Sequence, residues 1–345
     1  MENKKTGLVM EGGAMRGLFT AGVIDVFMEN GIDFEGADGN EDTDPITPQI
    51  RVLDGVNPQD RAFLEAAENG ITTVVVSPGS ANPIGGQISA IKTRGVCIDD
   101  MMVEEFVGIK GALGENPKRS YDEKDQSPAT RMGTASVIRE ALKKAKDYKE
   151  QLDKYERDKE NETKPEWDFK NHAFLPVINR EKPIHFHAHR LDDIFTAIRI
   201  AKEFDIKIVI IHGTEAHLAP QRIAIESIGI LSGPILTDRS KPELKNQSEQ
   251  APYLLTKAGI ETALITDHPE TPQKFLSLCA MTAMSGGMEY TDVLKAVTVI
   301  PSRLCGIDNR VGSIKEGKDG DVIIWQGKPL EPLAKPKTVI IDGQE

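Results

Sequence analysis

The sequence predicts an α/β fold in the form of a (β/α)8 barrel of the TIM type, accompanied by a small partial β-sandwich unit at the C-terminal end. From about residue 50 onward, short apolar segments rich in β-branched residues alternate with segments of helical periodicity. Repeated alternation of this kind indicates parallel strands joined by right-handed crossovers. The 345 residues also exceed the roughly 250 that one such barrel needs.

The strands are predicted from continuous apolar runs. The clearest is Ile71-Thr72-Thr73-Val74-Val75-Val76, because an unbroken β-branched segment is typical of a strand buried on both faces. The seven predicted strands span residues 71–76, 87–92, 106–113, 184–188, 207–212, 228–236 and 261–267. Seven strands favour a closed barrel, although a doubly wound open sheet would give the same alternation.

Two helices are predicted with clear boundaries. Asn57-Pro58 has the residue types of an N-cap and first helical turn, apolar residues within 62–67 repeat at helical spacing, and Gly70 ends the element. The segment 191–204 carries one apolar face formed by residues three and four positions apart. Each of these helices connects or precedes predicted strands, as a barrel requires.

Two further regions differ from the alternating pattern. Residues 141–158 predict a lysine- and glutamate-rich helix, followed by a loop at 161–165, which together read as a solvated excursion between two barrel strands. Near the C-terminus, 311–314, 321–325 and 337–341 predict short strands separated by turn residues. These last segments predict the small antiparallel β unit.

The composition is that of a folded, acidic protein. Hydrophobic residues make up 39% and the formal net charge is −12, so there is no basic footprint for a nucleic acid. No apolar run approaches the roughly 18 residues that span a bilayer. Three widely spaced cysteines, and an N-terminus without the apolar core of a secretory signal, indicate a reduced, cytoplasmic location. A homo-oligomer is compatible with all of this.

Histidines gather at the ends of predicted strands. His185, His187 and His189 alternate along one strand, so a period of two puts them on one face. His212 ends the next strand, and Asp267 ends the last. Barrel enzymes carry catalytic groups at the carboxyl ends of their strands, and imidazole with carboxylate is a typical ligand set for zinc. The pattern predicts a metal site, with a set of structural histidines as the alternative.

Lys110 lies inside an otherwise apolar predicted strand. A buried lysine of this kind either extends its amine to solvent or to an ion-pair partner, or is carboxylated on its amine and bridges two metals. The sequence leaves both readings open.

From about residue 31 to residue 345 the chain resembles the amidohydrolase superfamily of metal-dependent hydrolases, near its imidazolonepropionase- and prolidase-like members. The motifs that carry the resemblance are Gly70-Ile71-Thr72-Thr73-Val74, His187-Ala188-His189-Arg190, Ile211-His212-Gly213, Thr266-Asp267-His268-Pro269 and the tail 310–325. The resemblance implies a barrel with a small β-sandwich, one or two divalent metals, and hydrolysis of a linear or cyclic amide-type C–N bond.

The same resemblance implies roles for particular residues. His187 and His212 become metal ligands, and Asp267 becomes both a ligand and the general base. Lys110 falls where relatives carry a carboxylated lysine, and Glu115 is the rival carboxylate for that position. The candidates for holding the substrate are His189, Arg190, His217 and His268. Zinc is the expected metal, as one ion or none.

The first 30 residues depart from the superfamily pattern. Its members begin with sandwich strands and a first barrel strand ending in H-x-H, whereas the first histidine here is His172. Residues 22–29 put Phe27 and Glu29 at the two histidine positions, and residues 7–17 instead resemble the glycine-rich opening of a patatin-like phospholipase. No G-x-S-x-G nucleophile motif follows.

We therefore interpret the sequence as a chimera with three parts: a patatin-like segment at 1–30, the hydrolase barrel at 31–300, and the C-terminal part of the sandwich at 301–345. The missing H-x-H predicts impaired hydrolysis. A catalytically inactive amidohydrolase fold is the alternative, and a lipid acyl hydrolase is the remote one.

Overall fold

The computed structural model describes residues 39–345 of the chain. Everything below concerns these residues. The patatin-like segment predicted at 1–30, with Phe27 and Glu29, lies outside the described residues.

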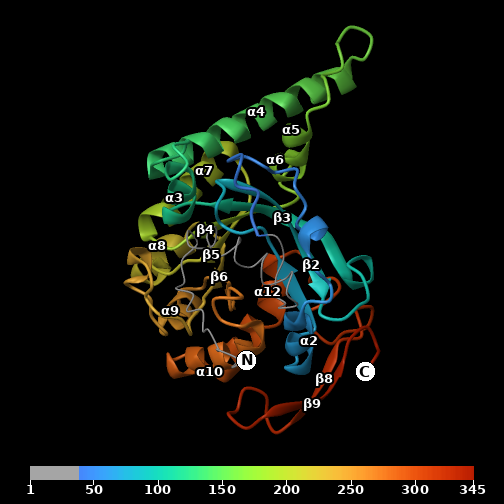
Figure 1. Ribbon diagram of the computed structural model, residues 1–345, viewed down its shortest axis with the longest axis vertical. Coiled ribbons are helices and arrows are strands. Elements are labelled where there is room, and N and C mark those ends of the chain that lie inside the picture. Colours follow the sequence, from blue (N-terminus) through green and yellow to red (C-terminus); the bar gives the residue numbers. More distant parts are fainter. Residues whose placement is uncertain (1–38) are drawn as a thin grey trace, which may run out of the picture. The chain divides into compact units, whose positions relative to one another are not determined.

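Seven strands form one sheet in the order in which they occur along the chain. They are β1 (Thr73–Val76), β2 (Ile84–Lys92), β3 (Met102–Ala112), β4 (Ile184–Ala188), β5 (Ile208–His212), β6 (Gly229–Ser232) and β7 (Thr262–Leu264). Each predicted strand segment overlaps one of them, although β2 and β3 begin earlier than the predicted residues 87 and 106. The sheet curls into part of a TIM-type barrel with helices on its outer side (Figure 1). The predicted α/β barrel with a small separate β unit is confirmed.

The direction of the first three strands corrects the prediction of parallel strands throughout. β3 to β7 are parallel to one another, but β1–β2 and β2–β3 are antiparallel. The connections at 77–83 and 93–101 explain this, because a parallel crossover needs about a dozen residues or more.

The helices lie mainly in the connections between the parallel strands. They are α2 (Arg61–Glu68), α3 (Glu115–Asp122), α4 (Arg131–Arg157), α5 (Phe169–Ala173), α6 (Leu175–Ile178), α7 (Leu191–Phe204), α8 (Pro220–Ala224), α9 (Ala251–Lys257), α10 (Leu276–Ser285), α11 (Tyr290–Ala296) and α12 (Val299–Leu304). Helix α7 has the predicted bounds, and its apolar face packs with β4 and β5 in the main core. No helix of the described part is long and apolar enough to cross a membrane.

Two helix predictions need correction at their starts. Helix α2 is capped by Asp60, whose side chain accepts a hydrogen bond from the backbone N–H of Ala62. The predicted cap, Asn57, instead lies in the turn before the helix, where its side chain accepts a hydrogen bond from the backbone N–H of Gln59. Helix α4 begins at Arg131 rather than at residue 141. Its first half buries Ile138 in the core, and only the rest is the predicted solvated excursion (Figure 1).

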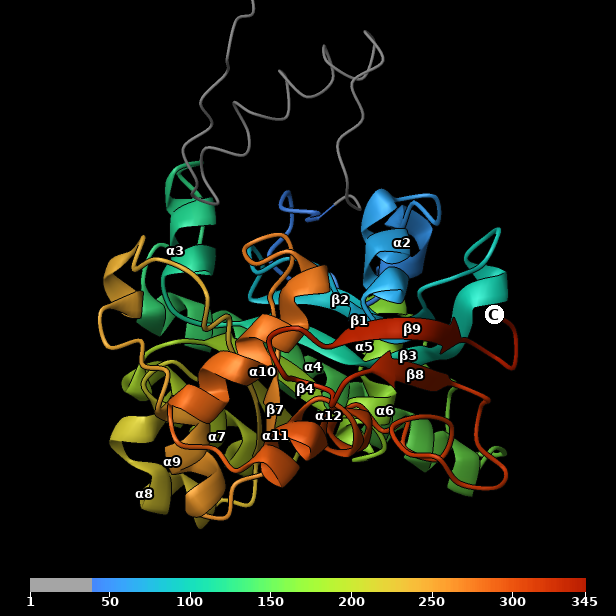
Figure 2. The same cartoon turned by 90° about the horizontal axis from the view of Figure 1, so that it is seen from below.

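The C-terminal unit is a separate antiparallel pair, β8 (Val322–Gln326) and β9 (Lys335–Ile340). The third strand predicted at 311–314 does not form, because Val311 is instead buried against β2 and β3. Figure 2 shows β8 and β9 beside the antiparallel edge of the main sheet.

A buried ion-pair cluster joins this unit to the barrel. Lys92 ends β2 and is 1% exposed, and its Nζ lies 2.9 Å from Asp319 and 2.8 Å from Asp321. Burial acts to lower the pKa of Lys92, but hydrogen bonds to Asp321 and Asp319 outweigh it and raise that pKa. Lys92 therefore stays charged and holds the two segments together.

Replacing Lys92 with Met should lower the free energy of unfolding by about 2–4 kcal/mol, because breaking a buried pair leaves carboxylates uncompensated. Urea unfolding measures this. The matched control is Lys143→Met, which removes an exposed helical pair with Asp147 and should leave the free energy of unfolding almost unchanged, because water screens an exposed pair. Equal losses in the two variants would contradict the assigned role of Lys92.

Candidate metal centre

The three histidines of the β4 segment are buried and share one face of the strand. All five residues of β4 are buried, and the buried His189 directly follows Ala188, the last residue of the strand. His185 lies deepest, against β3, where a Cβ added to Gly108 would come within 2.9 Å of its ring. His187 and His189 therefore lie progressively nearer the carboxyl end of the sheet.

His212 reaches the same place through an unusual backbone conformation. It pairs with Ala188 in the parallel register, so regular alternation would direct its side chain with Ile210 toward the helices. Its φ of +73° breaks this alternation. The ring of His212 instead lies 4.5 Å from that of His187 and 4.4 Å from that of His189, centroid to centroid. A left-handed non-glycine residue at a strand end is the kind of strain found at functional sites.

The three rings present converging nitrogens. One ring nitrogen from each of His187, His189 and His212 lies within 4.8 Å of the other two. Each Nδ1 is already engaged: with Ser80 Oγ at 3.0 Å for His187, with Thr214 Oγ1 at 2.7 Å for His189, and with Gly233 O at 2.7 Å for His212. The Nε2 atoms of His187 and His189 are buried without a hydrogen-bond partner among the described residues. Histidines that bind metals are oriented in this way, through the nitrogen that does not bind.

Burial keeps these imidazoles neutral. It lowers the pKa of His187 and of His189 well below the ordinary value, and the neighbouring rings lower both further. Burial also lowers the pKa of His212, partly opposed by the charge of Asp267. A neutral imidazole keeps the lone pair that a cation needs, so the group is chemically suited to hold a divalent metal.

Two charged groups from other strands face this cluster. Lys110 in β3 is buried, which lowers its pKa to about 8, and the charge of Asp267 opposes the shift. Asp267 follows β7 with a φ of +54°, the second left-handed strand-end residue. The carboxylate of Asp267 is near enough to act on both Lys110 and His212, but it is not part of the 4.8 Å nitrogen group.

The other sequence-derived candidates lie around the cluster. Glu115 begins α3 and pairs with Arg119 at 3.3 Å, and Arg190 pairs with Asp192. His217 Nδ1 contacts the carbonyl of Thr214 at 2.9 Å. His268 Nδ1 accepts from the backbone N–H of Gln273 at 3.2 Å. Within residues 39–345, none of these four contacts the three rings directly.

Sequence reasoning missed Glu243, Lys241 and Ser80. Glu243 is 2% exposed, with Oε1 3.8 Å from His189 Nε2 and 3.1 Å from Lys241 Nζ. The residues around Glu243 are polar and without periodicity, so nothing in the pattern signals burial. The one signal that the sequence offered was that Ser80 and Glu243 lie in the segments that follow β1 and β6, where functional residues of a barrel are found.

Residues 59–345 match the profile described as the amidohydrolase family. The chain belongs to the amidohydrolase family. A solved amidohydrolase from Thermotoga maritima MSB8 is 45% identical, with a TM-score of 0.86 over 89% of this chain and 80% of that one. The family consists of metal-dependent hydrolases that act on C–N bonds, and the three buried imidazoles fit that requirement.

Two curated relatives are similar over unequal shares. Amidohydrolase tasK of Hapsidospora irregularis is 28% identical over 94% of this chain and 36% of its own length. An imidazolonepropionase of Legionella pneumophila (strain Corby) is 33% identical over 26% of this chain and 23% of its own. The chain thus spans about a third or less of the length of these relatives.

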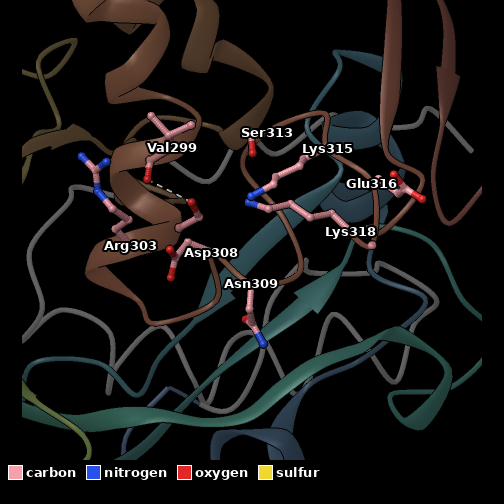
Figure 3. Close-up of a pocket in the computed structure, with 10 residues that line it drawn as sticks. Val299, Arg303, Asp308, Asn309, Ser313, Lys315, Glu316 and Lys318 are labelled. Carbon is pink, nitrogen blue, oxygen red and sulfur yellow. Dashed lines mark hydrogen bonds between the residues drawn. The ribbon is translucent and has the colours of Figure 1, made fainter.

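This amidohydrolase family member also has a surface pocket, and its lining residues come from a later part of the sequence than the histidines. It has a volume of about 420 Å³ and is formed by α12 and the loop after it (Figure 3). Lys315 and Lys318 extend into it, beside the carboxylate-bearing Asp308 (Figure 3). None of the histidines lines this pocket.

Replacing His212 with Ala should abolish retention of a divalent metal, because it removes one of only three converging imidazoles. Metal per chain after dialysis, measured by elemental analysis, checks this. The control is His217→Ala, since the His217 ring bonds a backbone carbonyl outside the group. Unchanged stoichiometry in His212→Ala would contradict the assignment.

Proposed function

We propose that this chain hydrolyses an amide-type C–N bond, linear or cyclic, in a small molecule, with one divalent cation, zinc, bound at the ends of β4 and β5. The observation that supports this most is the group of three neutral imidazoles, each fixed through Nδ1, with the Nε2 atoms of His187 and His189 buried without a hydrogen-bond partner among the described residues. His187, His212 and Asp267 are the ligands expected from the sequence, with a carboxylated Lys110 or Glu115 as a further one. The geometry favours adding His189 to the two histidines.

In this proposal a divalent cation supplies Lewis acidity, lowering the pKa of water and polarising a carbonyl. Asp267 accepts the proton of the attacking water and returns it to the leaving nitrogen. A new C–O bond forms as the C–N bond breaks, and the proton ends on the amine product. The closeness of Asp267 to both Lys110 and His212 supports this role. Arg190, His217 and His268 are the candidates for orienting the substrate.

Three further expectations stay proposals. One is the division into parts at residues 30 and 300, and another is the patatin-like identity of residues 1–30. The third is impairment by the missing H-x-H. The inactive fold is the second candidate because the first histidine of the sequence is His172, well beyond the first three strands.

Replacing Asp267 with Asn in the zinc-loaded protein should lower the hydrolysis rate about 10²- to 10⁴-fold, the usual contribution of a positioned general base. Turnover of a panel of linear and cyclic amides measures this, with metal content determined in parallel. A rate that is unchanged at equal metal content would contradict the role of Asp267. No turnover of any amide by the zinc-loaded wild type favours the inactive fold, and ester turnover alone favours the acyl hydrolase.

Lys110 should react with carbon dioxide increasingly as the pH rises through about 8, because only the neutral amine attacks. Carbon-13 NMR with labelled bicarbonate at pH 7 and pH 9 measures the carbamate signal, and Lys110→Met should remove it. Lys92 is an internal control, since its raised pKa keeps that buried amine protonated. A signal that survives in Lys110→Met would rule out this site.

A further inference from the structure

Glu243 is a buried carboxylate beside the histidine group to which neither the sequence nor the family resemblance assigned a role. It lies in the short helix Pro242–Leu244, in the connection between β6 and α9, and its side chain is 1% exposed. A carboxylate taken out of water is costly unless both oxygens are compensated. The partners of its two oxygens therefore decide what it does.

One oxygen is structurally engaged. Glu243 Oε2 accepts a hydrogen bond from the backbone N–H of Glu115 at 3.2 Å, and Arg131 lies 3.7 Å away. Gly114 makes the approach possible, because its φ is +90° and an added Cβ would come within 3.1 Å of Oε2. These contacts fix the carboxylate and leave the other oxygen directed at the histidines.

The other oxygen has no hydrogen bond among the described residues. Oε1 of Glu243 and Nε2 of His189 are both buried without a hydrogen-bond partner and lie 3.8 Å apart. Lys241 Nζ is 3.1 Å from Oε1 as an ion-pair partner, and its positive charge balances the carboxylate from one side.

A separation of 3.8 Å is too long for a direct hydrogen bond between the two atoms. If His189 Nε2 carries no proton, two lone pairs face each other in a buried space. A cation about 2.0–2.2 Å from each atom, the usual zinc distance to imidazole nitrogen and carboxylate oxygen, would satisfy both. Glu243 lies outside the group whose ring nitrogens are all within 4.8 Å of one another, so its carboxylate has to turn toward His187 and His212 for one cation to contact all four side chains.

We propose that Glu243 Oε1 is a ligand of the bound cation, on the His189 side, so that the site is three imidazoles and one carboxylate from the β6–α9 connection. This inference rests on the proposed metal centre. It gives a negatively charged ligand to a site that lacks the H-x-H expected on a first barrel strand, and it leaves Asp267 to act as the base.

The test compares the wild type, Glu243→Gln and Glu243→Asp with the control Glu215→Gln. Glu215 is also buried, but its oxygens accept from Leu191 N and Asn246 Nδ2, which a glutamine oxygen can replace in part. Zinc affinity is measured by competition with a chromophoric chelator, and the geometry of the site by the visible spectrum of the cobalt(II) form. Thermal unfolding in chelator checks that each variant folds.

Glu243→Gln should weaken zinc binding by about 10- to 100-fold or more and change the cobalt spectrum, while Glu215→Gln keeps both. Glu243→Asp keeps the charge but shortens the side chain, so this variant should also bind zinc more weakly. If Glu243→Gln does not fold, the zinc affinity of Glu243→Asp tests the proposal in its place. Wild-type affinity and an unchanged spectrum in the Glu243 variants, with metal still lost in His212→Ala, would overturn this inference and leave the metal centre standing. A wild type that binds no zinc would overturn both.

Discussion

The site depends on holding three neutral imidazoles in a buried space so that one ring nitrogen of each converges on the same place. Burial alone would leave the rings free to rotate or to flip. Here each Nδ1 is tied to a different element: Ser80 after β1, Thr214 after β5 and Gly233 after β6. The loops at the carboxyl ends of the sheet therefore have to be correctly packed before the rings can converge.

The backbone contributes as much as the side chains. A parallel sheet brings the ends of β4, β5 and β7 to one edge, but it does not by itself turn every end residue inward. His212 and Asp267 both adopt positive φ angles, which direct side chains against the strand alternation. Such conformations persist only where surrounding packing over-determines them. Val209 and Ile211, packed with β6 and β7, supply that packing beneath His212.

The charged side chains around the site come in pairs of opposite sign. Lys110 in β3 and Asp267 after β7 carry opposite charges near the rings, and Lys241 and Glu243 form a second pair of opposite charge. At the antiparallel edge of the sheet Lys92 is also buried, but two close aspartates raise its pKa. Lys110 has only the more distant charge of Asp267 to oppose burial, and its pKa is lowered.

The sequence by itself determined the strand segments, helix α7 and the histidines at the strand ends, because hydrophobic periodicity and alternation are local properties of the chain. It also indicated Lys110 and Asp267, since a charged residue within or directly after an apolar run stands out. Only the tertiary structure decided that β1, β2 and β3 run antiparallel, that His189 joins His187 and His212, and that Glu243 is buried beside them. The reason is physical: strand direction depends on how short connections close, and the burial of Glu243 depends on Gly114, Glu115 and Arg131, which are more than a hundred residues away in sequence.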